Sequence, residues 1–98
     1  MSPRLPFADK RLMSLSAQEF ETSVGKLGAH RKSAEGFPVF DLTGGSVEIR
    51  YAPAPPKTFG GLLSLPQAHV SLVFEGAGDA ERAAFVHRFD IAFQRGGG

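Results

Sequence analysis

The chain of 98 residues has room for one domain. Hydrophobic residues make up 42% and charged residues 21%, a globular composition that excludes a disordered chain, a collagen-like rod and a coiled coil. Eleven Lys and Arg against ten Asp and Glu leave a net charge of +1, so we expect neither a nucleic-acid surface nor a polybasic membrane anchor.

The chain contains no cysteine, which excludes disulfides, thiolate nucleophiles and zinc ribbons. No apolar run approaches the ~20 residues that a membrane helix needs. The N-terminal residues also lack the apolar core of a signal peptide. We therefore expect a soluble, cytoplasmic protein without a cofactor or a membrane partner, whose nine Phe side chains mostly fill its core.

A helix start is the clearest local signal. Residues Ser16–Glu19 form a capping box, in which the Ser hydroxyl and the Glu carboxylate each accept a backbone N–H of the other residue. Gly28 suits the helix end. A one-sided stripe lies between them, so we predict a helix over Ala17–Leu27, preceded by a short strand within Arg11–Leu15. The stripe consists of Phe20, Val24 and Leu27.

From Phe37 onward the hydrophobic period changes to two. Segments Phe37–Leu42 and Ser46–Tyr51 flank Thr43-Gly44-Gly45, which predicts a β-hairpin. The residues between the first helix and this hairpin, 29–36, have no period and read as a loop. In the second segment, Val47, Ile49 and Tyr51 share one face while Ser46, Glu48 and Arg50 share the other, as in an antiparallel sheet with one covered face.

Prolines interrupt the next part of the chain. Segment Ala52–Lys57 contains three of them, so we predict an extended connection rather than a strand. Two further strands, Phe59–Leu65 and His69–Glu75, are expected to join near Pro66.

A second helix is predicted over Ala80–Gln94, with Asp79 as its N-cap and Gly96 marking its end. Its apolar stripe consists of Phe85, Phe89, Ala92 and Phe93. Segment Ile91–Gln94 has an alternative interpretation as a strand.

These elements predict an α+β fold, a two-layer sandwich in the order (β)-α-β-β-β-β-α. Both helices pack on one face of an antiparallel sheet of four to five strands. We expect a single domain over residues 1–98, with a flexible N-terminal arm at about 1–10 and a flexible tail at about 95–98.

Two surfaces are candidates for contact with a partner. The outer face of the second helix is less polar than a solvated face should be, and carries Ala84, His87 and Ile91. The outward face of the sheet is polar, and carries Glu48, Arg50, His69 and Ser71, with Glu75 beyond them.

No residues form a recognisable catalytic or metal-binding pattern. The histidines at 30, 69 and 87 lack metal-ligand spacing, although His87 lies three residues from Asp90 and can pair with it on the helix surface. Segment Gly76–Gly78 precedes a helix, but Asp79 at the cap would repel a phosphate. An enzyme using His69, His87 or the sheet carboxylates would need a cleft around one of them.

The last four residues are Arg95, Gly96, Gly97 and Gly98. This ending resembles the tails of ubiquitin-like modifiers and of bacterial sulfur carriers. The resemblance implies adenylation of the terminal carboxylate, followed by a thiocarboxylate or an isopeptide bond. It covers only these four residues, and the β-grasp fold of those families reaches the tail from a strand.

The sequence thus favours a small non-enzymatic module that binds a partner protein or assembles with itself, and no nucleic acid or membrane. The alternative is a carrier or modifier protein acting through its C-terminal Gly-Gly.

Overall fold

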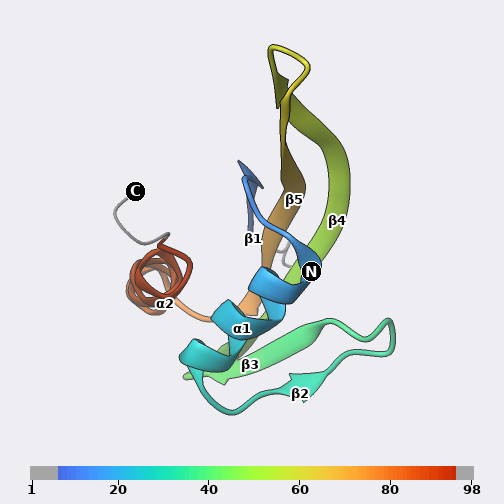
Figure 1. The fold of residues 1–98 in the computed structure, drawn as a ribbon. Coiled ribbons are helices and arrows are strands. Elements are labelled where there is room, and N and C mark those ends of the chain that lie inside the picture. Colours follow the sequence, from blue (N-terminus) through green and yellow to red (C-terminus); the bar gives the residue numbers. More distant parts are fainter. Residues whose placement is uncertain (1–6, 95–98) are drawn as a thin grey trace.

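The computed structural model describes residues 7–94, which form one five-stranded antiparallel sheet and two helices. The elements, in chain order, are β1 (Phe7–Met13), α1 (Ala17–Leu27), β2 (Arg31–Lys32), β3 (Pro38–Leu42), β4 (Gly45–Phe59), β5 (Leu63–Gly76) and α2 (Asp79–Ala92). The strand order across the sheet is β1-β5-β4-β3-β2 (Figure 1). The predicted α+β class and the order β-α-β-β-β-β-α are confirmed.

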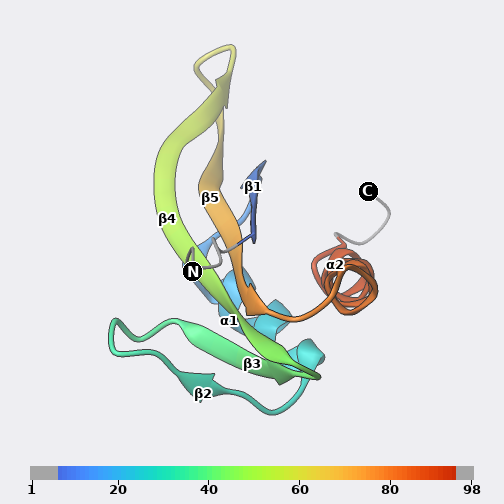
Figure 2. The same cartoon turned by 180° about the vertical axis from the view of Figure 1, so that it is seen from behind.

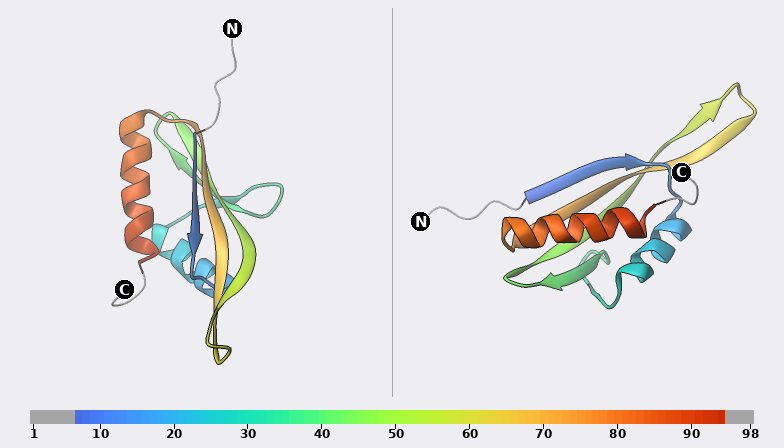
Figure 3. Two further views of the ribbon diagram at one scale, coloured as in Figure 1. Left: turned by 90° about the horizontal axis from the view of Figure 1, so that it is seen from above. Right: turned by 90° about the vertical axis from the view of Figure 1, so that its left-hand side faces the viewer.

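Both helices pack on one face of the sheet, as predicted (Figure 3). The predicted alternation places Val47 and Ile49 of β4 against them, with no exposed area on either residue. The buried core joins residues from both helices, from the segments before and after them and from three strands: Leu15, Phe20, Val24, Leu27, Phe40, Val47, Ile49, Val70, Leu72, Phe74, Phe85, Phe89, Ala92 and Phe93.

Helix α1 has the predicted bounds because its capping box forms. The Ser16 backbone N–H donates to Glu19 Oε1 at 2.9 Å, and the Glu19 N–H donates to Ser16 Oγ at 3.1 Å. At the other end Gly28 adopts a φ of 108°, a left-handed conformation that glycine tolerates without a steric penalty.

Helix α2 differs from its prediction at both ends. Gly78 is the N-cap without a side-chain hydrogen bond, while Asp79 is already helical and pairs with Arg82. The helix ends at Ala92, so the strand considered for Ile91–Gln94 does not form. Gly96, the predicted end signal, lies outside the described residues.

The first strand is longer than predicted. Strand β1 begins at Phe7, so the last four residues of the expected N-terminal arm are paired with β5, and residues 1–6 lie outside the described range. A second unpredicted pairing joins β2 to the edge of β3 within the segment read as a loop.

The prediction of an extended connection at Ala52–Lys57 was wrong, because β4 continues through the prolines to Phe59. Strand β3 pairs with β4 only from Gly45 to Glu48. Prolines further along β4 therefore break no hydrogen bond to β3, although they have no N–H to donate. A register shift between Ala54 and Lys57 absorbs the two prolines there.

The predicted strand Phe59–Leu65 was also wrong, because a turn interrupts it. Gly60 and Gly61 have φ of 59° and 74°, the positive values that a tight hairpin turn requires, and the Leu62 N–H donates to the Phe59 carbonyl at 3.2 Å. Strand β5 then runs unbroken through Pro66, whose carbonyl accepts the Leu15 N–H at 3.1 Å.

Candidate partner-binding surface

The paired ends of β4 and β5 extend beyond the rest of the sheet as a two-stranded arm, which we define as residues 53–67 (Figures 1 and 2). The last β1 pair joins Met13 to Ala68, and the last β3 pair joins Val39 to Glu48, so within the arm the ladder pairs join only β4 and β5, and the Leu15 bond to Pro66 lies at its base. The arm makes the molecule elongated, with extents of 54 × 27 × 24 Å.

The tip of the arm exposes large apolar side chains. The exposed fractions of Phe59, Leu62 and Leu63 are 44%, 97% and 54%. Phe59 is paired with Leu63, and Lys57 with Leu65, so these four side chains share one face of the ribbon. The Lys57 ammonium lies 5.3 Å from the centre of the Phe59 ring.

Sequence reasoning missed the arm, although the sequence carries two signals for it. Gly60-Gly61 stands between apolar residues and is a two-glycine turn signal. In addition, the chain from Glu48 to Glu75 contains Arg50, Lys57 and His69 but no other Asp or Glu between those two acids. An apolar segment without carboxylates is therefore visible before the fold is known.

The four predicted sheet residues lie on the face away from the helices. Arg50 of β4 is paired with Ser71 of β5, which is paired in turn with Lys10 of β1. Together with His69 they border a shallow hollow of about 410 Å³, whose full lining is Lys10, Phe37, Arg50, Tyr51, Ala52, His69 and Ser71. Sequence reasoning missed Lys10, because the β1 register was not predicted.

Glu48 belongs to the neighbouring part of the same face. Its Oε1 lies 2.7 Å from Arg50 Nε, and its side chain also borders a second hollow with Glu75. Burial tends to raise the pKa of Glu48, but hydrogen bonds from Ser33 and Arg50 outweigh it and hold the pKa below its usual value. The hydrogen bond and charge of Glu48 raise the pKa of Arg50 in return.

The other predicted partner-facing residues lie on the opposite layer. Ala84, His87 and Ile91 are exposed on α2, and the exposed fraction of Ile91 is 60%. Ile91 borders a hollow between α1 and α2 with Lys26, Leu27, Arg88 and Ala92. Since α2 covers the inner face of the sheet, the structure does not bring these residues to the sheet hollow. Partner contact through α2 stays a prediction.

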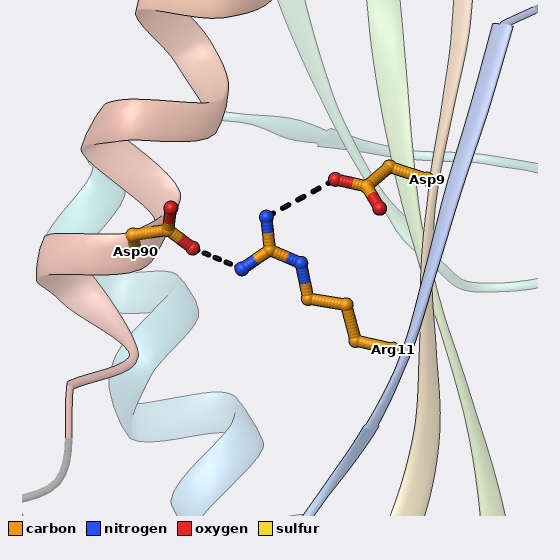
Figure 4. Close-up of polar contacts among 3 residues, drawn as sticks. All are labelled: Asp9, Arg11 and Asp90. Carbon is orange, nitrogen blue, oxygen red and sulfur yellow. Dashed lines mark hydrogen bonds and ion pairs between the residues drawn. The ribbon is translucent and has the colours of Figure 1, made fainter.

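An ion network joins β1 to α2 on the inner side of the sheet (Figure 4). The Arg11 guanidinium donates to Asp90 of α2 and, at 3.1 Å, to Asp9 of its own strand, and it lies 5.4 Å from the Phe89 ring centre. Burial lowers the pKa of Arg11, but the two carboxylates raise it above the ordinary value. Asp90, which was expected to pair with His87, thus attaches the edge strand to the helix.

Within residues 7–94 no three His, Asp or Glu side chains are placed to hold a metal ion. No helix in that range is long and apolar enough to span a membrane. Residues Arg95–Gly98 lie outside the described range, and the chain reaches them from helix α2 rather than from a strand. Carrier chemistry at Gly98 stays a prediction.

Comparisons with models of protein families, with curated proteins and with solved structures found no match to this chain.

Proposed function

We propose that this chain is a non-enzymatic protein-interaction module that binds a partner polypeptide through the arm. The observation that carries the proposal is the exposure of Phe59, Leu62 and Leu63 on a two-stranded ribbon that no helix and no third strand within residues 7–94 covers.

An arm of this kind is poorly stable by itself. A two-stranded hairpin in water is only marginally stable, since it lacks a covered apolar face. Large side chains gathered at its tip favour contact with another apolar surface. Burying one such side chain contributes about 1.5–3 kcal/mol. A partner that covers the tip would therefore stabilise the arm and gain affinity from the same contacts.

The charge of the arm and its base indicates the chemistry of the partner. The segment between Glu48 and Glu75 contains no acidic side chain. Its basic side chains are those of Arg50, Lys57 and His69. Two arms placed side by side would bring like charges together, which disfavours pairing of two copies. We therefore propose a different polypeptide, with apolar side chains for the tip and carboxylates near them.

The prolines restrict how this partner can bind. Pro53, Pro55 and Pro56 have no N–H, so the free edge of β4 offers few donors to an added strand. The partner should therefore cover the faces and tip of the arm with side chains instead of extending the sheet along β4.

A site-specific cross-linking experiment tests the proposal. A photoreactive amino acid replaces Leu62 in one variant and Ile91 of α2 in a matched variant, and both are irradiated in the source cells. We expect a defined protein to cross-link at position 62 and not at 91. In recombinant form it should bind the full chain, and the triple variant Phe59→Ser/Leu62→Ser/Leu63→Ser should weaken binding by about tenfold or more.

Three outcomes would contradict the proposal. One is equal cross-linking at both positions, and another is unchanged affinity of the triple variant. The third is a dimer in light scattering that the triple variant dissociates, because it would identify a second copy of the chain as the occupant.

A further inference from the structure

We propose that the hollow bordered by Lys10, Arg50, His69 and Ser71 binds carboxylate side chains of the segment that covers the arm. This inference rests on the proposed function and adds the polar half of the recognition surface.

The strand register gathers the donors of this site from three strands. Lys10, Ser71 and Arg50 are consecutive cross-strand partners on β1, β5 and β4, so they form one row across the sheet. With neighbouring strands about 4.8 Å apart, the backbones at Lys10 and Arg50 lie about 10 Å from each other, with Ser71 between them. His69 lies two residues along β5 from Ser71, on the same face.

These donors are largely unused within the described residues. No hydrogen bond or ion pair joins Lys10, His69 or Ser71 to another described side chain. Arg50 donates its Nε–H to Glu48, and its side chain also borders the hollow. A planar guanidinium, an ammonium, a hydroxyl and an imidazole are together well suited to a carboxylate, since all four can donate to its oxygens.

The hollow is continuous with the apolar face of the arm. Along β5, residues 63, 65, 67, 69 and 71 share the outward face, so this face runs from Leu63 and Leu65 through Gln67 to His69 and Ser71. Ser71 lies six positions after Leu65, which corresponds to about 20 Å of strand. A partner segment that covers both sites should therefore place its carboxylates about 20 Å from its apolar side chains.

Two features favour carboxylates over a nucleic-acid strand. Glu48 and Glu75 lie on the same face beyond the row of donors, so a long chain of phosphates would meet like charges there. The row also supplies two permanent cations, too few for the extended phosphate contacts that nucleic-acid binding requires. Because Glu48 already pairs with Arg50, a single carboxylate matches the remaining charge.

The test is an NMR titration of the full ¹⁵N-labelled chain at low ionic strength with acetylated hexaglutamate. Inorganic phosphate and an oligothymidylate serve as parallel probes. We expect saturable shifts of the amides of Lys10, Arg50, His69 and Ser71. The variant Lys10→Gln/Arg50→Gln should weaken hexaglutamate binding by about tenfold or more.

The matched control, Lys26→Gln/Lys32→Gln, removes two cations from elsewhere on the surface and should leave the binding unchanged. The triple arm variant should also bind hexaglutamate normally. Hexaglutamate binding therefore tests the hollow alone, and a result against the hollow can be distinguished from a result against partner binding through the arm.

The inference would be overturned by an absence of saturable shifts at the four amides. An equal loss of binding in both double variants would also overturn it, because it would indicate non-specific attraction to net charge. Tighter binding of the oligothymidylate than of hexaglutamate would assign the hollow to nucleic acid instead.

Discussion

Strands β4 and β5 run through both the arm and the rest of the described fold, which we call the body, yet their side chains differ sharply in exposure between the two regions. Within the body, Val47 and Ile49 of β4 are fully buried, whereas Leu62 at the tip of the arm is 97% exposed. Both regions are rich in apolar residues and both have paired backbones. The difference is the layer of helices, which covers only the body. Apolar side chains are therefore present in both regions, and they become buried only where the helices cover the sheet.

The largest contrast should appear when a core aromatic side chain is compared with one on the arm. Phe89 is fully buried, and its ring centre lies 4.2 Å from that of Phe93. The substitution Phe89→Ala should lower the free energy of unfolding by about 3–5 kcal/mol in urea denaturation. Phe59→Ala on the arm should change it by less than about 0.5 kcal/mol. Similar losses at both positions would show that the arm belongs to the folded core.

A smaller loss of stability is expected at Gly45, which begins β4 beside the connection from β5 to α2. A Cβ on Gly45 would lie 2.0 Å from the Glu75 carbonyl oxygen and 2.5 Å from the Ala77 nitrogen, so the backbone must shift. Gly45→Ala should destabilise the fold by about 1–3 kcal/mol. The matched change Gly25→Ala, in open space on α1, should stabilise it by about 0.5–1 kcal/mol. Thermal melting curves compare the two, and a neutral Gly45→Ala would contradict the close approach.

The ion network around Arg11 should contribute less to the free energy of unfolding than the close packing at Gly45. Arg11→Met retains the apolar stem but removes the donors to Asp9 and Asp90, whose side chains are 29% and 49% exposed. Because solvent screens such pairs, we expect a loss of about 1 kcal/mol in chemical denaturation. Lys10→Met, on the opposite face of β1, serves as the control and should be neutral within about 0.5 kcal/mol. Equal effects of the two changes would mean that charge alone, and not the contact with α2, matters.

The smallest effect on stability is predicted for the arm itself. The triple variant Phe59→Ser/Leu62→Ser/Leu63→Ser should change the free energy of unfolding by less than about 0.5 kcal/mol. Hydrogen exchange should be fast at residues 57–65 and slow at residues 70–74, because only the latter lie in the covered sheet. Slow exchange in the arm of the isolated chain would contradict its description as an uncovered ribbon.

Local signals accounted for much of the body. The capping box at Ser16–Glu19 and the alternation in β4 and β5 predicted helix α1 and the buried face of the sheet, because each depends on residues close together in the chain. The outward residues Arg50, His69 and Ser71 followed from the same alternation. Their grouping with Lys10 did not, since it depends on which strand pairs with β5.

The arm illustrates why the remaining features could not be predicted in the same way. Prolines at 53, 55 and 56 argue against a strand wherever both edges must be paired. They are tolerated in β4 because β3 has already ended, which is a property of the sheet and not of the segment. The Gly60-Gly61 turn was missed for a related reason, since the apolar residues on both sides of it also fit a single continuous strand.

The sequence by itself determined the class of fold, the bounds of α1, the buried faces of the strands and the near-neutral charge. These features rest on short-range periodicity, capping and composition, and such interactions act within a few residues. Only the tertiary structure decided how far β4 and β5 extend beyond the helices, and which side chains share the hollow at their base. Both depend on where the neighbouring strands end, and strand pairing joins residues that are far apart in the chain.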